Sequence, residues 1–205
     1  MEEIVKKQQE ILGPIVDELR IMVGTARNAF NRNSRTDLEE LKKIKERVDR
    51  DIKEATSQME AAIPGKSENE KTALLRLHSI LSHLEIMSEN IAGMSEPIRK
   101  KIQDVVLFTD KAFSQTNYLF NHQTGMLRSL LDIIKTDNDF LKKYVLEEGR
   151  VLIQLCLDVA TEHETRMIEG LCMPQASPIF LAMLDRMRLI WRHVLAIVKL
   201  LTKES

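Results

Sequence analysis

Only 7 glycines and 5 prolines interrupt the 205 residues of this chain, and their scarcity restricts the folds that it can adopt. Sheets joined by tight turns need frequent glycine and proline, whereas long helices need very few. Between the interruptions, apolar residues recur three and four positions apart, as in Leu74, Leu77, Leu81, Leu84 and Ile91. This spacing is that of the buried face of a helix. We therefore predict an all-α fold.

Three interruptions divide the first half of the chain. Gly13-Pro14 is expected to separate a lead helix, residues 1–13, from the helix that follows. Thr36–Glu39 and Ser67–Glu70 both have the form of a capping box, in which a hydroxyl and a carboxylate satisfy free backbone N–H groups, so each is expected to start a helix. A unit of three helices is therefore predicted over residues 14–94.

The second half repeats this order of interruptions at an offset of roughly one hundred residues, which is typical of a tandem duplication of structure. Pro97 is expected to open a long amphipathic helix, with Asn121–Gly125 as the candidate position of a kink. Lys135–Asp139 is a polar break, and Ser177-Pro178 places a hydroxyl at the N-cap of the last helix. A second unit is predicted over residues 95–205, packed on the first as one body, because either unit alone leaves an apolar face uncovered.

The charge pattern argues against a nucleic-acid partner and against insertion into a membrane. Thirty Lys and Arg nearly cancel 31 Asp and Glu, and no long run of one sign offers a surface for phosphates. The most apolar stretch, Ile179–Leu201, contains charges such as Asp185 and Lys199 that would be costly in a bilayer. We predict a buried helix there.

The sequence also indicates a cytoplasmic protein that is not an enzyme. Cys156 and Cys172 have no zinc-binding spacing, and the first ten residues lack the apolar core of a signal peptide. No Ser/His/Asp or Cys/His arrangement and no phosphate-binding glycine loop can be identified. Catalytic residues and cofactors are therefore expected to be absent.

Several segments resemble a known family. Glu89–Ala92 resembles the ENIA sequence that ends the third helices of PhoU proteins. The segments Phe108–Phe120 and Glu162–Cys172, followed by Ser177–Phe180, resemble the cytoplasmic C-terminal PhoU domain of sodium/phosphate cotransporters. The resemblance implies a tandem pair of three-helix bundles with six helices. It also implies a non-enzymatic regulator of phosphate transport or signalling that docks onto a membrane phosphate transporter or a sensor protein. A homodimer is a further candidate assembly.

The resemblance implies in addition that metal clusters have been lost. In PhoU proteins the third helix of each unit carries two carboxylates four residues apart, which bind iron or another hard cation. Here those positions fall on Ser82 and Ile86 in the first unit and on Arg188 and Arg192 in the second. We therefore expect no metal cluster at either helix.

Two weaker alternatives remain open at this stage. Glu85 and Glu89, four residues apart, would form a metal site with Glu46 and Asp49 if the helix register were shifted, and would then support a metal-dependent enzyme. A solvated acidic face is the favoured interpretation.

The second alternative is that Arg188 and Arg192 hold a phosphate-like anion. Salt bridges to neighbouring helices are the favoured use of these arginines. His163, which lies between two glutamates, is interpreted as a surface residue or as a residue that supports a ligand.

Overall fold

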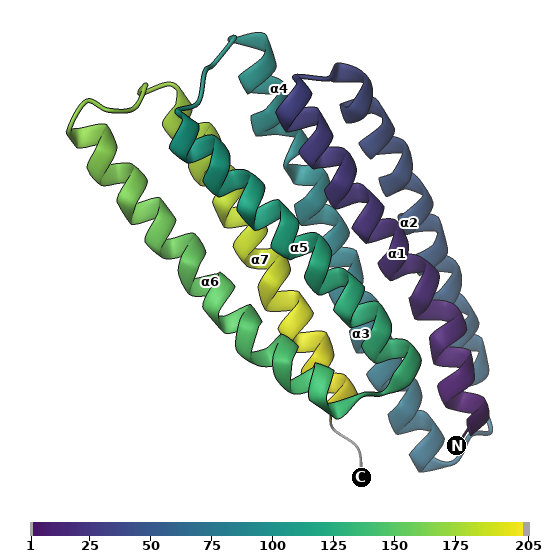
Figure 1. The fold of residues 1–205 in the computed structure, drawn as a ribbon. Helices are drawn as coiled ribbons and strands as arrows, with labels where there is room; N and C mark the ends of the chain where they lie inside the picture. Colours follow the sequence, from purple (N-terminus) through teal and green to yellow (C-terminus); the bar gives the residue numbers. More distant parts are fainter. Residues whose placement is uncertain (1, 203–205) are drawn as a thin grey trace.

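The computed structural model describes the backbone of residues 2–202 and the side chains of residues 9–202. Over this range the chain forms six long helices and one short one, and no strand, which confirms the predicted all-α fold. In chain order the helices are α1 (Glu2–Arg32), α2 (Arg35–Ala62), α3 (Glu68–Gly93), α4 (Ser95–Gln103), α5 (Asp110–Thr136), α6 (Asp139–Ile168) and α7 (Ala176–Thr202) (Figure 1).

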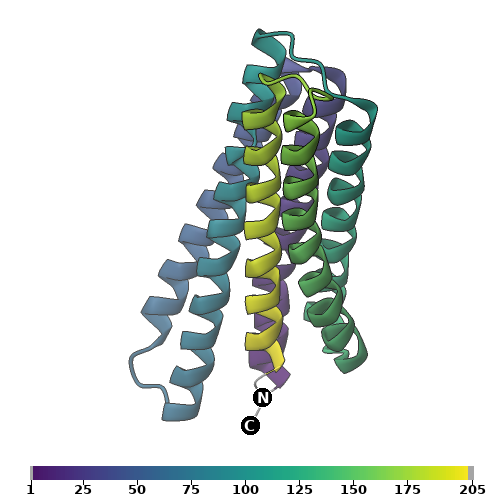
Figure 2. The same cartoon turned by 90° about the vertical axis from the view of Figure 1, so that its left-hand side faces the viewer.

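The long helices form two three-helix units side by side, as predicted. Helices α1, α2 and α3 contact one another, and so do α5, α6 and α7. The units meet where α1 packs on α5 and α3 packs on α7, so these four helices form the centre of the body. Helices α2 and α6 lie on opposite outer sides, and α4 covers one end of the interface (Figures 1 and 2).

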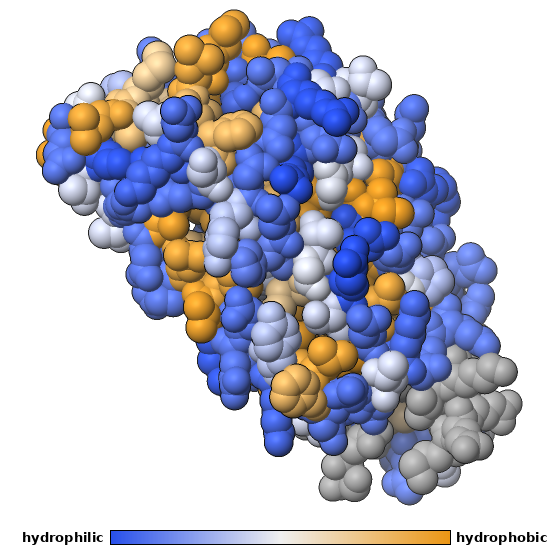
Figure 3. All heavy atoms as spheres, in the orientation of Figure 1, coloured by the Kyte–Doolittle hydropathy of each residue, from blue (hydrophilic) through white to orange (hydrophobic). Residues whose placement is uncertain are grey.

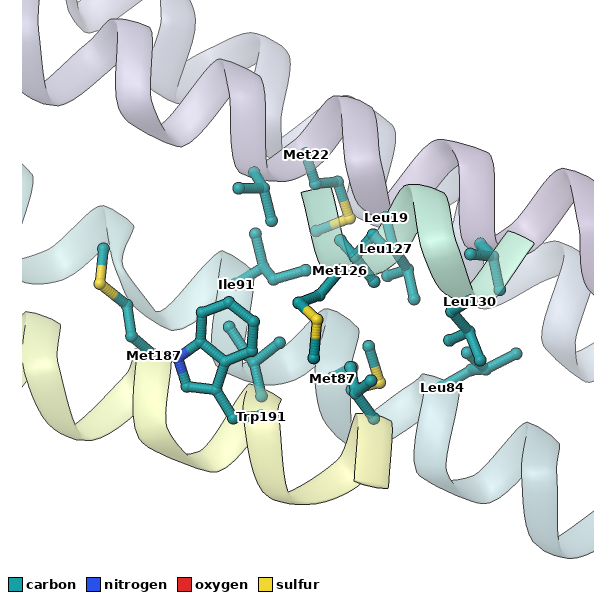
Figure 4. Close-up of a cluster of buried hydrophobic side chains, with 14 of the residues drawn as sticks. Leu19, Met22, Leu84, Met87, Ile91, Met126, Leu127, Leu130, Met187 and Trp191 are labelled. Carbon is teal, nitrogen blue, oxygen red and sulfur yellow. The ribbon is translucent and has the colours of Figure 1, made fainter. Parts of the chain in front are cut away.

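A single hydrophobic core fills the space between the four central helices. Figure 4 shows side chains from all four of them meeting there. The fully buried side chains include Leu19 and Met22 of α1, Leu84, Met87 and Ile91 of α3, Leu127 and Leu130 of α5, and Met187 and Trp191 of α7. Because both units contribute to one core, neither can expose its inner face without losing this packing. None of the helices in the described part of the chain combines the length and the apolarity needed to cross a bilayer.

Helix α1 continues through Pro14, so the predicted separation of a lead helix over residues 1–13 is wrong. Proline inside a helix removes one hydrogen bond and costs about 3 kcal/mol. Leu12 and Ile15 on either side of it are almost completely buried, and each such side chain contributes about 1.5–3 kcal/mol when removed from water. Burial on both sides therefore outweighs the effect of the proline.

Of the two predicted capping boxes, the one at Ser67 forms and the one at Thr36 does not. Helix α2 begins at Arg35, and the Oγ of Ser34, not of Thr36, accepts the backbone N–H of Asp37 at 3.1 Å. The box at Thr36 does not form, because that residue already lies inside the helix. The box of α3 is confirmed: the Ser67 Oγ accepts the Glu70 N–H, and the Glu70 carboxylate accepts the Ser67 N–H at 3.0 Å.

The later helix ends are close to their predicted positions. Helix α5 ends at Thr136 and α6 starts after Asn138, whose side chain caps it by accepting the N–H of Leu141, so the predicted polar break is confirmed. Helix α7 begins at Ala176, one residue before the predicted N-cap Ser177. Such one-residue differences are within the usual uncertainty of helix ends.

The long helix predicted after Pro97 is instead a short helix, a loop and a long helix. Pro97 lies in the first turn of α4, and α5 begins at Asp110 and runs through Asn121–Gly125 without interruption. Helix α4 is held in place by Lys101, whose buried ammonium group donates to the carbonyl of Phe30 at 3.1 Å and lies 4.9 Å above the centre of its ring. Burial lowers the pKa of Lys101.

Candidate functional site

The structure brings together two of the four acidic residues proposed as metal ligands, but a lysine already joins them. Lys45 of α2 donates to both carboxylate oxygens of Asp49, at 2.6 and 2.7 Å, and to the Oε1 of Glu89 on α3 at 2.6 Å. Burial alone would lower the pKa of Lys45, but its hydrogen bonds to the two carboxylates and their charges raise it. An ammonium group therefore occupies the position that a cation would need.

The other two acidic candidates do not complete a site. Glu46 and Glu85 are exposed on α2 and α3. Over the described residues, no group of three or more His, Cys, Asp or Glu side chains lies close enough together to hold a metal ion. The favoured interpretation of a solvated acidic face fits this arrangement.

Arg188 and Arg192 lie one turn apart on α7, but they are not equivalent. Arg188 is bonded to Asp185 on its own helix, with 2.6 Å between its Nη2 and the Oδ1. Arg192 is exposed, and its charge lowers the pKa of its neighbour His193. The ion pair neutralises one of the two arginines that a phosphate-like anion would need, so the anion site stays a prediction with less support.

His163 is buried, so its interpretation as a surface residue is wrong. The side chain is 1% exposed and lies against the ring of Phe180, with 4.6 Å between the ring centres. Both ring nitrogens are buried and have no hydrogen-bond partner in the described structure. The pKa of His163 is lowered, first by burial and then by the charge of Arg166. Its flanking residue Glu162 faces outward and pairs with Lys111 of α5.

A pair of histidines, which the sequence did not reveal, joins the two units. His83 of α3 and His193 of α7 lie with their Nδ1 atoms 2.9 Å apart, and both side chains are half-buried. Burial lowers the pKa of both, and in His193 the charges of His83 and Arg192 lower it further. The residues are 110 positions apart in the chain, so no local spacing could have indicated the contact.

One end of the molecule carries an unusual number of exposed apolar side chains. Two loops meet there: the α4–α5 loop packs Val106 and Phe108 against Ala176 and Ile179 at the start of α7. Figure 3 shows apolar atoms gathered over this end. We define the end surface as the exposed large apolar residues of the two loops and of the last position of α6: Val105 (78% exposed), Leu107 (70%), Ile168 (84%), Leu171 (62%) and Met173 (47%).

Val105 also has an unfavourable backbone conformation. Its φ is 50°, in the left-handed region. It follows the C-cap Asp104, and the next N–H, that of Val106, donates to the Lys101 carbonyl at 3.0 Å. This is the hydrogen-bond pattern of a Schellman motif, in which glycine is the usual residue at the left-handed position. A β-branched residue there costs about 1–2 kcal/mol. The long helix predicted after Pro97 would have included Val105, which instead lies in the α4–α5 loop.

These features define an all-helical protein built from a tandem pair of three-helix units. No family model and no curated protein matches the sequence. Among solved structures, the crystal structure of PhoU from Pseudomonas aeruginosa is similar to this chain, with a TM-score of 0.85 at 12% sequence identity. The similarity covers 98% of this chain and 96% of that chain. The chain therefore has the PhoU fold.

The more specific resemblance to the cytoplasmic domain of sodium/phosphate cotransporters stays a prediction. It rests on the sequence segments Phe108–Phe120, Glu162–Cys172 and Ser177–Phe180. In the structure these segments form the end of the α4–α5 loop with the first part of α5, the end of α6 with the first part of the α6–α7 loop, and the start of α7.

Proposed function

We propose that this protein is a cytoplasmic, non-enzymatic regulator of phosphate transport or signalling, and that it works by docking its end surface onto a membrane phosphate transporter or a sensor protein. The PhoU fold over nearly the whole chain supports the role. The observation that carries the docking proposal is the group of exposed apolar side chains at the end where α4–α5 and α6–α7 connect.

The end surface has the physical properties of an interface. Soluble proteins expose single apolar residues commonly, but apolar residues gathered on adjacent loops usually mark a binding surface. The strain at Val105 points in the same direction, because unfavourable backbone conformations persist most often at functional positions. Glycine would remove the strain, so we infer that the exposed valine side chain makes a contact with the docking partner.

The proposed docking does not use the metal-ligand candidates on α2 and α3 or the anion-binding candidates Arg188 and Arg192. The ammonium group of Lys45 already joins Asp49 and Glu89, so a metal cluster is not needed to hold α2 against α3. Docking would depend on the shape and apolar character of the end surface alone. The partner is taken to be a protein, because the charges near the two loops are mixed and offer no concentrated basic area for anionic lipid.

The test combines uptake of labelled phosphate with a surface variant. Cells lacking the gene are complemented with the unchanged protein or with the triple variant Leu107→Ser, Ile168→Ser and Leu171→Ser. The matched control is Leu75→Ser, which changes a leucine of similar exposure (63%) on α3. Circular dichroism and gel filtration must show that all variants remain folded.

We expect the unchanged protein and the control to restore regulated phosphate uptake, and the triple variant not to. Full restoration by the triple variant would refute docking through the end surface. If deletion of the gene leaves phosphate uptake and the phosphate response unchanged, the proposed role itself is wrong.

A further inference from the structure

His83 and His193 form a direct polar contact between the two units. Their Nδ1 atoms are 2.9 Å apart, the ring centres are 5.1 Å apart and the ring planes are inclined by 49°. The two side chains come from α3 and α7, one of the two pairs of central helices that join the units. Both are half-buried, so solvent still reaches them.

The short distance between the two Nδ1 atoms is compatible with two protonation states of the histidines. Two neutral imidazoles at 2.9 Å form a hydrogen bond, in which one Nδ1–H donates to the lone pair of the other Nδ1. If both rings instead carry their proton on Nε2, two lone pairs converge on one point. Imidazole nitrogens are good ligands for zinc, copper and nickel, whereas magnesium and calcium require oxygen ligands.

We propose that His83 and His193 form a two-histidine site for a transition-metal cation of the Zn²⁺ type, which links α3 to α7 across the interface between the units. In tetrahedral coordination with Zn–N bonds of about 2.0–2.1 Å, the two nitrogens stand about 3.3 Å apart. The observed pair therefore has to open by only about 0.4 Å, a side-chain adjustment. Water fills the remaining coordination positions, to which the half-exposed side chains leave access.

Binding involves no net loss of a proton. Whichever ring carries its proton on Nδ1 transfers it to its own Nε2 through solvent, and the freed lone pair binds the metal. Since the pKa values of both residues are lowered, the rings are neutral near pH 7 and no proton competes for the lone pairs.

A neighbouring positive charge limits how tightly His83 and His193 can bind a metal cation. The charge of Arg192 acts on His193 and opposes the binding of a cation, but its side chain is exposed and well solvated. The site is separate from the acidic residues on α2 and α3, where Lys45 joins the carboxylates. It also differs from the carboxylate positions of PhoU proteins, which fall here on Ser82 and Ile86.

Isothermal titration of the full chain with ZnCl₂, after removal of metal with a chelator, tests the proposal. We expect one equivalent to bind. Each of His83→Gln and His193→Gln should weaken binding by at least about tenfold, because even loss of a residue that only supports a ligand costs 10–100-fold. Arg192→Ala should strengthen binding.

Two other histidines supply the controls. His78→Gln changes an exposed histidine on the same helix, α3, and should leave binding unchanged. His122→Gln removes the competing pair that His122 forms with Glu148, whose nearest atoms are 3.6 Å apart. The proposal is wrong if His122→Gln abolishes the binding, if His83→Gln binds as tightly as the unchanged protein, or if no saturable binding occurs.

A measurement on the unchanged protein covers the case in which a histidine variant does not fold. With one equivalent of Cu²⁺, electron paramagnetic resonance should show superhyperfine lines from two nitrogens. Lines from a single nitrogen, or none, would overturn the assignment.

Discussion

Truncation of one core leucine tests whether the two units form a single cooperative body. Leu84 of α3 is 0% exposed and lies in the shared core (Figure 4). The change Leu84→Ala removes three carbons, and at about 0.8 kcal/mol per carbon their transfer to water costs about 2.4 kcal/mol. The cavity left between the packed helices adds to this, so we expect the free energy of unfolding to fall by about 3–4 kcal/mol.

Urea unfolding with two probes measures the effect. Circular dichroism reports all helices, whereas the fluorescence of Trp191, the only tryptophan, reports α7 in the second unit. Because Leu84 lies in the first unit, a shift of the Trp191 transition shows that destabilisation of one unit is felt in the other. Both probes should give the same lowered midpoint.

The control for this experiment is Leu75→Ala, on the same helix but 63% exposed, which should change stability by no more than about 0.5 kcal/mol. If Leu84→Ala leaves the Trp191 midpoint unchanged while the circular dichroism splits into two transitions, the units unfold independently and the argument for one shared core is refuted.

Three further predictions concern single residues. Val105→Gly should stabilise the protein by about 1 kcal/mol, because glycine adopts the left-handed conformation without strain and the side chain that is lost is 78% exposed. A loss of stability in urea unfolding would contradict this. Lys45→Met should destabilise by about 1 kcal/mol, since it removes the ammonium group between Asp49 and Glu89; a cost that does not shrink in high salt would argue against an ionic origin. The folded-state pKa of His163 lies below its ordinary value of 6.5, so as the pH falls the unfolded chain takes up a proton at this residue before the folded protein does. The protein should therefore lose stability from about pH 6.5 downward. In chelator-containing buffer, His163→Phe should reduce that loss. An equal pH dependence in this variant would show that His163 is not responsible.

The sequence predicted the features that depend on neighbouring residues. The capping box at Ser67 and the helical spacing of Leu77, Leu81 and Leu84 are local, and both appear as predicted. Dependence on local signals also explains why the helix break predicted at Pro14 is wrong. Pro14 has the same sequence signature whether or not its neighbours are buried, and only tertiary packing shows that the helix continues.

The candidate sites were harder to predict for the same reason. Asp49 and Glu89 were grouped only in the weaker metal-site alternative, which required a shifted helix register. The lysine that joins them was not considered, because Lys45 resembles any other surface lysine in the sequence. The contact between His83 and His193 joins residues 110 positions apart and has no local pattern at all.

Because α2 and α6 lie on opposite flanks, they can loosen or tolerate substitutions more easily than the central helices. Each of these helices contacts helices of its own half, and in the described residues α6 touches only α5 and α7. A flank helix can therefore loosen or acquire substitutions while the four central helices keep their packing. Amide hydrogens of α6 should accordingly exchange with solvent sooner than those of α7, and variation among distant homologues should concentrate on the flanks.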